Sequence, residues 1–311
     1  LGFGEARELI EDTDPRLRIE RYAVTGGMAR YLAELGSGGP LRDLVCERLL
    51  DPNGALFNDP REVLEHELSQ VATYFSILQE LATGEKALGE IAAAVRMPAT
   101  SMSRPLDTLR EMAVIERRTP INARAGDRSS RYRISDSFLR FWFRFVFPYQ
   151  EDLASGLAPA DLYALEIEPA LAEHVAPVFE ALCREWVRRN RGQRASRVGS
   201  WWGPTTKAGR QQGRHTEEID IVGLGRGRAT VVGECKWTAK PMSVSILAAL
   251  EDYKLPALRQ DGVRLAGDLE IVLFSCSGFT EGLTERAREN PRLVLVDLAE
   301  LVTGIDPPAR A

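Results

Sequence analysis

The sequence predicts an α/β protein whose N-terminal half is α-helical, and three observations predict it. Up to about residue 190, apolar residues recur mainly at helical spacing and are interrupted by segments that contain Gly and Pro. Further along, short runs rich in Val, Ile and Leu alternate with helical patterns, which is typical of a β-sheet with helices on both faces. Within the helical half, the order of three helices and two short strands predicts a winged helix-turn-helix.

Length and composition indicate a globular protein of two or three domains. The 311 residues are 44% hydrophobic and 27% charged, and the net charge of -5 argues against a uniformly basic nucleic-acid binder. The four cysteines form no C-x-x-C pair, so we expect no zinc site or disulfide framework and a reducing, cytoplasmic compartment. No apolar run approaches the roughly 18 residues that span a bilayer. The chain begins Leu-Gly-Phe-Gly without Met, which we interpret as a sign that it belongs to a longer protein.

Residues 1–59 are the first predicted segment, and they are expected to form short helices. Apolar residues lie at helical spacing in 6–10 and 29–35. The Gly-rich stretch 36–39 then separates these helices from another that begins at Pro40. Acidic side chains outnumber basic ones in this segment.

Residues 60–148 are predicted to form the winged helix. An amphipathic stripe from Val63 to Leu81 precedes a short helix at 88–95, a turn at Met97-Pro98 and a third helix at 99–112. Strands near 114–118 and 130–135 flank a basic loop at 125–128, and an aromatic helix follows at 138–148. Clustered arginines are typical of phosphate contact, so we expect DNA contacts from Arg104, Arg110, Arg117, Arg118, Arg128 and Arg131. The alternative is a protein–protein or interdomain module in which these arginines only solvate a loop.

Residues 149–311 are the third predicted domain, in which strands and helices alternate. The predicted elements are helices 158–173 and 175–190, strands 218–224 and 229–236, helix 243–259, strand 269–276, helix 280–290 and strand 293–298.

Two of these strands carry the residues that indicate chemistry. Period-two alternation places Asp220 on one face of its strand, and it places Glu234 and Lys236 together on one face of the next. The turn Gly225–Gly227 joins the strands as a hairpin, which brings Asp220 beside Glu234. Converging carboxylates without His or Cys favour Mg²⁺ or Mn²⁺, and the Lys236 ammonium group could orient water or stabilise charge on a phosphate. The alternative is an edge hairpin with solvated charges.

The spacing of Asp220, a hairpin and Glu234-Cys235-Lys236 resembles the core of the PD-(D/E)XK nuclease superfamily. The resemblance implies a restriction-endonuclease-like mixed β-sheet flanked by helices. A first helix in that family usually offers another acidic residue, and Glu180 matches this placement best, with Glu185 as second choice. It implies Asp220 and Glu234 as metal ligands, with Lys236 and Glu180 completing the catalytic set.

Other segments resemble a narrower group, the C-terminal region of prokaryotic AAA-type ATPases. They are Trp201-Trp202, 233–237 and 274–279, together with 22–32, which is similar to the lid segment of those ATPases. No G-x-x-x-x-G-K-[ST] occurs, so we expect no ATPase activity from this chain alone and a possible ATPase domain or subunit as its partner.

Together these features predict a DNA-binding protein with a Mg²⁺-dependent phosphodiesterase site. The alternatives are a non-catalytic winged-helix regulator and the regulatory tail of an ATPase. A basic run before the site could guide DNA to it, or could be a solvated helix end and loop: Arg184, Arg188, Arg189, Arg191, Arg194, Arg197, Lys207, Arg210 and Arg214.

Overall fold

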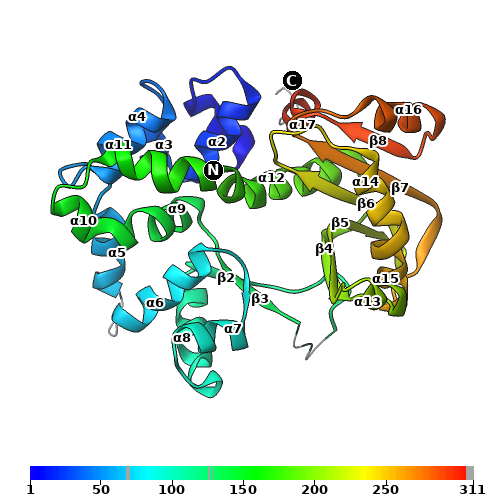
Figure 1. The fold of residues 1–311 in the computed structure, drawn as a ribbon, viewed down its shortest axis with the longest axis horizontal. Helices are drawn as coiled ribbons and strands as arrows, with labels where there is room; N and C mark the ends of the chain where they lie inside the picture. Colours follow the sequence, from blue (N-terminus) through cyan, green and yellow to red (C-terminus); the bar gives the residue numbers. More distant parts are fainter. Residues whose placement is uncertain (68–70, 125–126, 128, 306–311) are drawn as a thin grey trace. The chain divides into compact units, whose positions relative to one another are not determined.

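The protein consists of two compact units. The computed structural model describes residues 1–67, 71–124, 127 and 129–305 (Figure 1). Unit 1 contains Leu1–Arg118 and Ser130–Val175, and unit 2 contains Thr119–Ser129 and the chain from Ala176 onward. The chain therefore passes between the units three times.

Unit 1 is mainly helical. Helix α2 shows why its elements begin and end where they do: Asp14 caps the N-terminus by accepting from the Arg16 backbone N–H at 2.8 Å, Pro15 follows, and Gly26 at φ +64° ends it. The helices are α1 (Phe3–Ala6), α2 (Pro15–Thr25), α3 (Ala29–Leu35), α4 (Leu41–Val45), α5 (Asp59–Glu67), α6 (Val71–Ala82), α7 (Leu88–Ala94), α8 (Ser103–Glu111), α9 (Ser137–Phe145), α10 (Gln150–Ala154), α11 (Pro159–Leu162) and the first part of α12 (Glu168–Arg191).

A small antiparallel sheet of unit 1 follows the predicted order of elements. Among the described residues it contains β1 (Lys86–Ala87), β2 (Ile115–Arg118) and β3 (Arg131–Ile134), in the order β1-β3-β2. Helices α7 and α8, with a 3₁₀ turn at Ala99–Ser101 before α8, lie between β1 and β2 in the chain. The structure thus confirms the helices predicted at 88–95 and 99–112 and the strands predicted at 114–118 and 130–135. Most of their ends agree within one residue, but α8 begins at Ser103, after the 3₁₀ turn.

The core of unit 1 is built around the aromatic helix α9, the helix predicted at 138–148. Phe138, Phe141, Trp142 and Phe143 are each 0% exposed. The Trp142 indole donates a hydrogen bond to the Phe57 carbonyl at 2.9 Å, and the ring of Tyr31 stacks on Phe138 at 3.7 Å. Burying each such side chain contributes about 2–3 kcal/mol. Residues before and after position 60 therefore share one hydrophobic core.

Unit 2 is an α/β unit with a mixed sheet. In the described part of this unit the strand order is β4-β5-β6-β7-β8, antiparallel through β6 and parallel from β6 to β8. Its elements are the second part of α12, β4 (Arg197–Pro204), α13 (Lys207–Gln211), β5 (Thr216–Gly225), β6 (Arg228–Lys236), α14 (Val244–Ala249), a π-helical turn (Leu250–Lys254), α15 (Leu255–Gln260), β7 (Leu265–Ser275), α16 (Glu281–Glu289), β8 (Leu293–Val296) and α17 (Leu298–Gly304).

Helices cover both faces of this sheet, as the alternation of elements predicts. On one face, Leu273 of β7 belongs to a buried cluster with Leu247 of α14 and Leu258 of α15. The next residue, Phe274, points to the other face and meets Trp186 of α12 edge to face at 5.5 Å. The architecture is therefore α/β with a helical N-terminal half and a mixed five-stranded sheet in the described residues.

β2 and β3 pair antiparallel, and the segment between them contains the predicted basic loop at 125–128, of which residues 125, 126 and 128 lie outside the described residues. Residues 119–129 belong to unit 2, where the Ile121 backbone N–H donates to the Ser200 carbonyl at 2.9 Å and the Trp202 indole donates to the Ser129 carbonyl at 2.8 Å. These contacts join Ile121 and Ser129, at the two ends of the segment, to β4. The candidate DNA contact Arg128 lies outside the described residues.

Candidate functional site

The β5–β6 hairpin positions the residues that the sequence singled out. The turn residues Arg226 and Gly227 have φ of 50° and 73°, which is the two-residue turn that matches the twist of paired strands. The register pairs Ile221 with Gly233, so the next residues outward, Asp220 and Glu234, face each other across the two strands. Sequence reasoning predicted this juxtaposition.

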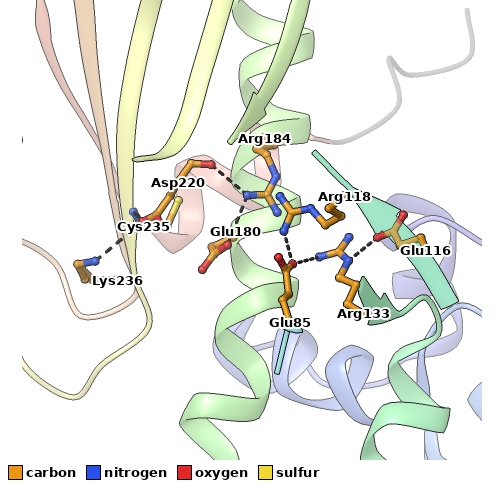
Figure 2. Close-up of polar contacts among 9 residues, drawn as sticks. All are labelled: Glu85, Glu116, Arg118, Arg133, Glu180, Arg184, Asp220, Cys235 and Lys236. Atoms are coloured by element: carbon orange, nitrogen blue, oxygen red, sulfur yellow. Dashed lines mark hydrogen bonds and ion pairs between the residues drawn. The ribbon is translucent and has the colours of Figure 1, made fainter. Parts of the chain in front are cut away.

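Asp220, Glu234 and Lys236 form one cluster on unit 2. The Lys236 Nζ lies 3.6 Å from Glu234 Oε2 and 3.9 Å from Asp220 Oδ2. Asp220 Oδ2 also accepts a hydrogen bond from the Cys235 backbone N–H at 2.8 Å, a contact that fixes the aspartate against β6 (Figure 2). The ammonium group therefore lies between two carboxylates from neighbouring strands.

Glu234 is the buried member of the cluster, with its side chain 1% exposed. Burial, and next the charge of Asp220, raise the pKa of Glu234 to about 7. Its Oε2 accepts a hydrogen bond from Lys254 Nζ at 2.6 Å, whereas Oε1 has no hydrogen-bond partner among the residues that the structure describes. A buried carboxylate oxygen without a donor is costly, so a cation or a proton would stabilise it.

Lys236 is held in its charged form. Burial acts to lower the pKa of Lys236, but the carboxylates of Asp220 and Glu234 act in the opposite sense and raise it above its ordinary value. Its side chain is still 32% exposed. The ammonium group is therefore a hydrogen-bond donor and a positive charge at neutral pH, and not a general base.

Glu180 is linked to the cluster through an arginine. Arg184, one turn further along α12 and 5% exposed at its side chain, contacts Glu180 Oε2 at 3.4 Å and donates to the Asp220 carbonyl at 3.0 Å (Figure 2). Glu180 thus faces β5 from the expected helix, with a guanidinium group between it and the Asp220 backbone. This geometry favours a supporting role over direct participation.

Two site residues escaped sequence reasoning. The sequence indicates Arg184 only as part of the basic run and gives no signal for Lys254. Lys254 ends the π-helical turn Leu250–Lys254, and such turns are often found at functional sites. No short-range pattern signals either contact, because each depends on packing of a helix against the sheet.

The donor set fits a hard divalent cation. Asp220 and Glu234 offer carboxylate oxygens, and Glu234 Oε1 is the unsatisfied atom that a cation would stabilise. In the described part of the chain, no group of three His, Cys, Asp or Glu residues is arranged to hold a metal ion. Mg²⁺ sites commonly use one or two carboxylates and complete the shell with water and substrate phosphate, so two protein ligands are compatible with such a site.

The candidate DNA contacts of unit 1 fall into two groups. Arg118 pairs with Glu85, and Arg110 pairs with Asp107 at 2.7 Å, so each has an acidic partner within the unit. Arg104 and Arg117 are exposed, and Arg131 is half-buried. Arg110 and Arg117 line a shared hollow that also contains Asp107 and Glu116. The basic surface is therefore partly neutralised by neighbouring carboxylates (Figure 2).

Most arginines of the second basic run are also paired. Glu185 contacts Arg188 and Arg189 at 3.0 and 2.8 Å, and Arg191 contacts Glu270 at 2.8 Å. Lys207 and Arg210 remain exposed on α13. These contacts favour a structural role for the helical part of the run.

The known proteins to which this chain is similar have no established function. A family model described as archaeal and bacterial proteins of unknown function, DUF234, matches residues 142–246. The matched segment contains Glu180, Asp220, Glu234 and Lys236.

One curated relative is an uncharacterised protein of Methanocaldococcus jannaschii. It is 25% identical over 225 residues, which cover 70% of this chain and 47% of the relative. The chain thus spans about half the length of the curated relative that it matches. No solved structure matches the chain. No helix in the described residues is long and apolar enough to cross a membrane.

Proposed function

We propose that unit 2 is a Mg²⁺- or Mn²⁺-dependent phosphodiesterase domain of the nuclease type, and that DNA is its substrate. The observation that carries the proposal is the cluster of Asp220, Glu234 and Lys236, in which an ammonium group lies within 4 Å of two carboxylates and one buried carboxylate oxygen has no partner among the described residues. The resemblance of this spacing to PD-(D/E)XK nucleases supports the same conclusion.

The charge and exposure of each residue indicate its proposed role in the reaction. Asp220 and Glu234 would hold the cation. When bound, the cation would stabilise the negative charge that develops on the phosphate oxygens. Lys236, charged and 32% exposed, would donate a hydrogen bond to the attacking water or to a phosphate oxygen. Lys254 and Arg184 would hold Glu234 and the Asp220 backbone in place.

The order of elements in unit 1 supports DNA binding as the accompanying activity. Helices α7 and α8, followed by β2 and β3, have the order of a winged helix, in which the second helix of the pair enters the major groove. Exposed Arg104 on α8 and exposed Arg117 on β2 would contact the phosphate backbone, and Arg110, Arg118 and Arg131 would contribute less because of their pairing or burial.

Calorimetry tests the metal site first. Mn²⁺ titrated into the full chain should show binding, and binding should be lost in Asp220→Ala. Asp252→Asn, which changes an exposed carboxylate in the same unit, should bind as wild type does. Plasmid cleavage should then require the metal, and Lys236→Met should bind metal but cleave at least about a hundredfold more slowly. No metal binding by the folded wild type would sink the proposal.

Ion pairing at the site favours a second candidate, a DNA-binding module that does not cleave. Lys254 and Lys236 contact Glu234 Oε2 at 2.6 and 3.6 Å, so the carboxylate charge is compensated without a metal. DNA binding by wild type and Asp220→Ala alike, with no cleavage in Mg²⁺ or Mn²⁺, would favour this candidate.

A resemblance to an ATPase lid segment, and not the length of the uncharacterised relative, favours a third candidate, the regulatory tail of an ATPase. This chain spans about half of that relative, and its residues 22–32 resemble an ATPase lid segment. A phosphate-binding loop of the form G-x-x-x-x-G-K-[ST] in the coding sequence upstream of Leu1 would support this candidate.

A further inference from the structure

The turn of the β5–β6 hairpin carries an arginine in an unfavourable backbone conformation. Arg226 has φ of 50°, in the left-handed region where two-residue hairpin turns strongly prefer Asn, Asp or Gly. The following residue, Gly227, meets the same requirement with no steric conflict. An Arg at the first turn position is thus a local departure from the best turn sequence, and such departures concentrate at functional positions.

The arginines of the turn differ from the arginines of α12 in their pairing. Arg226 and Arg228 are exposed, and neither pairs with an acidic side chain in the described part of the chain. By contrast, Arg188, Arg189 and Arg191 each contact a carboxylate. The positive charge at the turn is therefore uncompensated, whereas that of α12 is largely compensated.

A pocket lies beside the turn, and we call it the hairpin pocket. Its lining includes Arg194, Arg226, Arg228, Ser196, Thr230 and Asp268. Its volume of about 470 Å³ would accommodate a phosphate group with its bound water. It therefore gives the two uncompensated guanidinium groups a shared concave surface.

Two further arginines, Arg194 and Arg264, lie at or near the hairpin pocket. Arg194 is fixed by Asp268, since its Nη2 donates to Oδ2 at 3.0 Å and to the backbone carbonyl at 2.7 Å. Arg264 adds a fourth guanidinium, because its Nη2 would lie 3.8 Å from a Cβ built on Gly227. With four arginines and one aspartate, the surroundings of the hairpin pocket are strongly positive.

We propose that the hairpin pocket binds a phosphate group of a nucleic-acid backbone. Guanidinium groups present several N–H donors in a planar fork that matches phosphate oxygens, so Arg226 and Arg228 are suited to this ligand. Among the described lining residues there is no aromatic ring on which a base could stack, so the chemistry recognises the backbone and not the sequence. The choice of nucleic acid over free phosphate rests on the proposed function.

The distance between the pocket and the candidate site is compatible with one bound duplex. Arg228 and Glu234 lie six residues apart on β6, which corresponds to roughly 20 Å at about 3.3 Å per residue. That is about six base steps of a duplex, at 3.4 Å per step. The register of β6 shifts between Ala229 and Val231, so this spacing is a length along the strand and does not assign the pocket and the site to one face of the sheet.

The test measures duplex binding by the full chain in EDTA, so that cleavage plays no part. Fluorescence anisotropy with a labelled duplex would be compared for wild type and for the double variant Arg226→Asn with Arg228→Gln. Asn suits the left-handed turn position, so the hairpin is retained. Affinity should fall about tenfold, and the slope of log K against log salt should become shallower by about 0.9, because one phosphate contact is lost.

Controls separate this inference from the proposed function. Arg288→Gln removes an exposed arginine on α16 and should bind as wild type does. Asp220→Ala should also bind normally in EDTA, so a protein that binds but never cleaves would overturn the proposed function and leave the hairpin pocket standing.

Three results would overturn the inference itself. The first is unchanged affinity and unchanged salt slope in the double variant. The second is the absence of duplex binding by wild type. The third is tight binding of inorganic phosphate that the double variant loses while its duplex binding is unchanged, which would assign the pocket to the free anion.

Discussion

The ion pair between Lys254 and Glu234 stabilises a carboxylate that is almost fully buried. The two groups meet at 2.6 Å, and the Glu234 side chain is 1% exposed. Glu234 Oε2 has two ammonium contacts, and Lys254→Met removes the shorter one. The remaining contact is with Lys236 Nζ, at 3.6 Å. We expect unit 2 to lose about 2–3 kcal/mol of unfolding free energy at pH 8, measured by urea denaturation.

A double-mutant cycle with Glu234→Gln distinguishes this charge effect from lost packing. The neutral amide no longer needs the ammonium group, so Lys254→Met should cost less in the Glu234→Gln background than in wild type. Equal costs in both backgrounds would show that Lys254 stabilises the unit through its methylene groups alone.

His174 gives unit 1 a pH-dependent stability. The ring is 1% exposed, and burial, followed by the charge of Arg140, holds its pKa well below the ordinary value of 6.5. The unfolded chain takes up a proton here below about pH 6.5, whereas the folded chain stays neutral to lower pH. Stability from His174 is thus fully present above about pH 6.5 and falls by up to about 1.4 kcal/mol per pH unit below it.

Comparison of two glutamine variants isolates the contribution of His174 to the pH dependence of stability. His174→Gln keeps a donor that can reach the Ala23 carbonyl, which His174 Nε2 contacts at 2.9 Å, and it should flatten the decline in stability between about pH 6.5 and 5. His66→Gln changes an exposed histidine and should leave the decline as in wild type. A wild-type slope that survives His174→Gln would assign the pH dependence to carboxylates.

The residues of the candidate site were predictable only where they follow the chain. Asp220, Glu234 and Lys236 could be placed because strand alternation and one tight turn fix their faces. Lys254 and Arg184 could not, since their contacts depend on how helices far along the chain pack on the sheet. The pairing of Arg118 with Glu85 was hidden for the same reason, because 33 residues separate them.

The β5–β6 hairpin is the element whose stability can be changed separately from its proposed ligand. Arg226→Asn relieves an Arg from φ of 50° and should raise the unfolding free energy of unit 2 by about 0.5–1 kcal/mol. Gly227→Val places a β-branched residue at φ of 73° and should lower it by about 1–2 kcal/mol. Thermal and urea denaturation of both variants measure the difference.

The sign of the Arg226→Asn effect is the informative result. A variant that is more stable yet binds duplex more weakly would show that the arginine is retained at the cost of turn stability. A loss of stability in Arg226→Asn would instead mean that the arginine itself stabilises the turn, contrary to the argument from its backbone conformation.

Elements with a strong periodic pattern were predictable, and irregular ones were not. Strands β5 and β6 and helix α9 were expected because β-branched alternation and a dense aromatic stripe leave few alternatives. Strand β4 was missed because Trp201-Trp202 and the glycines at 199 and 203 break alternation. Helix α17 was missed because it is short and lies directly after β8.

At the scale of the whole molecule, the described residues of each unit bury a main set of apolar side chains of their own. The described core of unit 1 includes Leu78, and the core of unit 2 includes Leu273, both 0% exposed. The sequence indicated more than one domain from length alone. It could not show that residues 119–129 belong to unit 2, since that assignment depends on contacts of Ile121 with Ser200.

Two cores predict that unfolding is not a single two-state event. Leu78→Ala and Leu273→Ala each remove a fully buried side chain, which costs about 2–5 kcal/mol. Calorimetry should therefore resolve two transitions, with Leu78→Ala lowering the midpoint of one and Leu273→Ala that of the other. Metal added to wild type should raise only the transition that Leu273→Ala lowers, because Asp220 and Glu234 belong to unit 2. A single transition that both variants lower equally would show that the two cores unfold together, and the stability effects predicted for single residues would then have to be read from the whole chain.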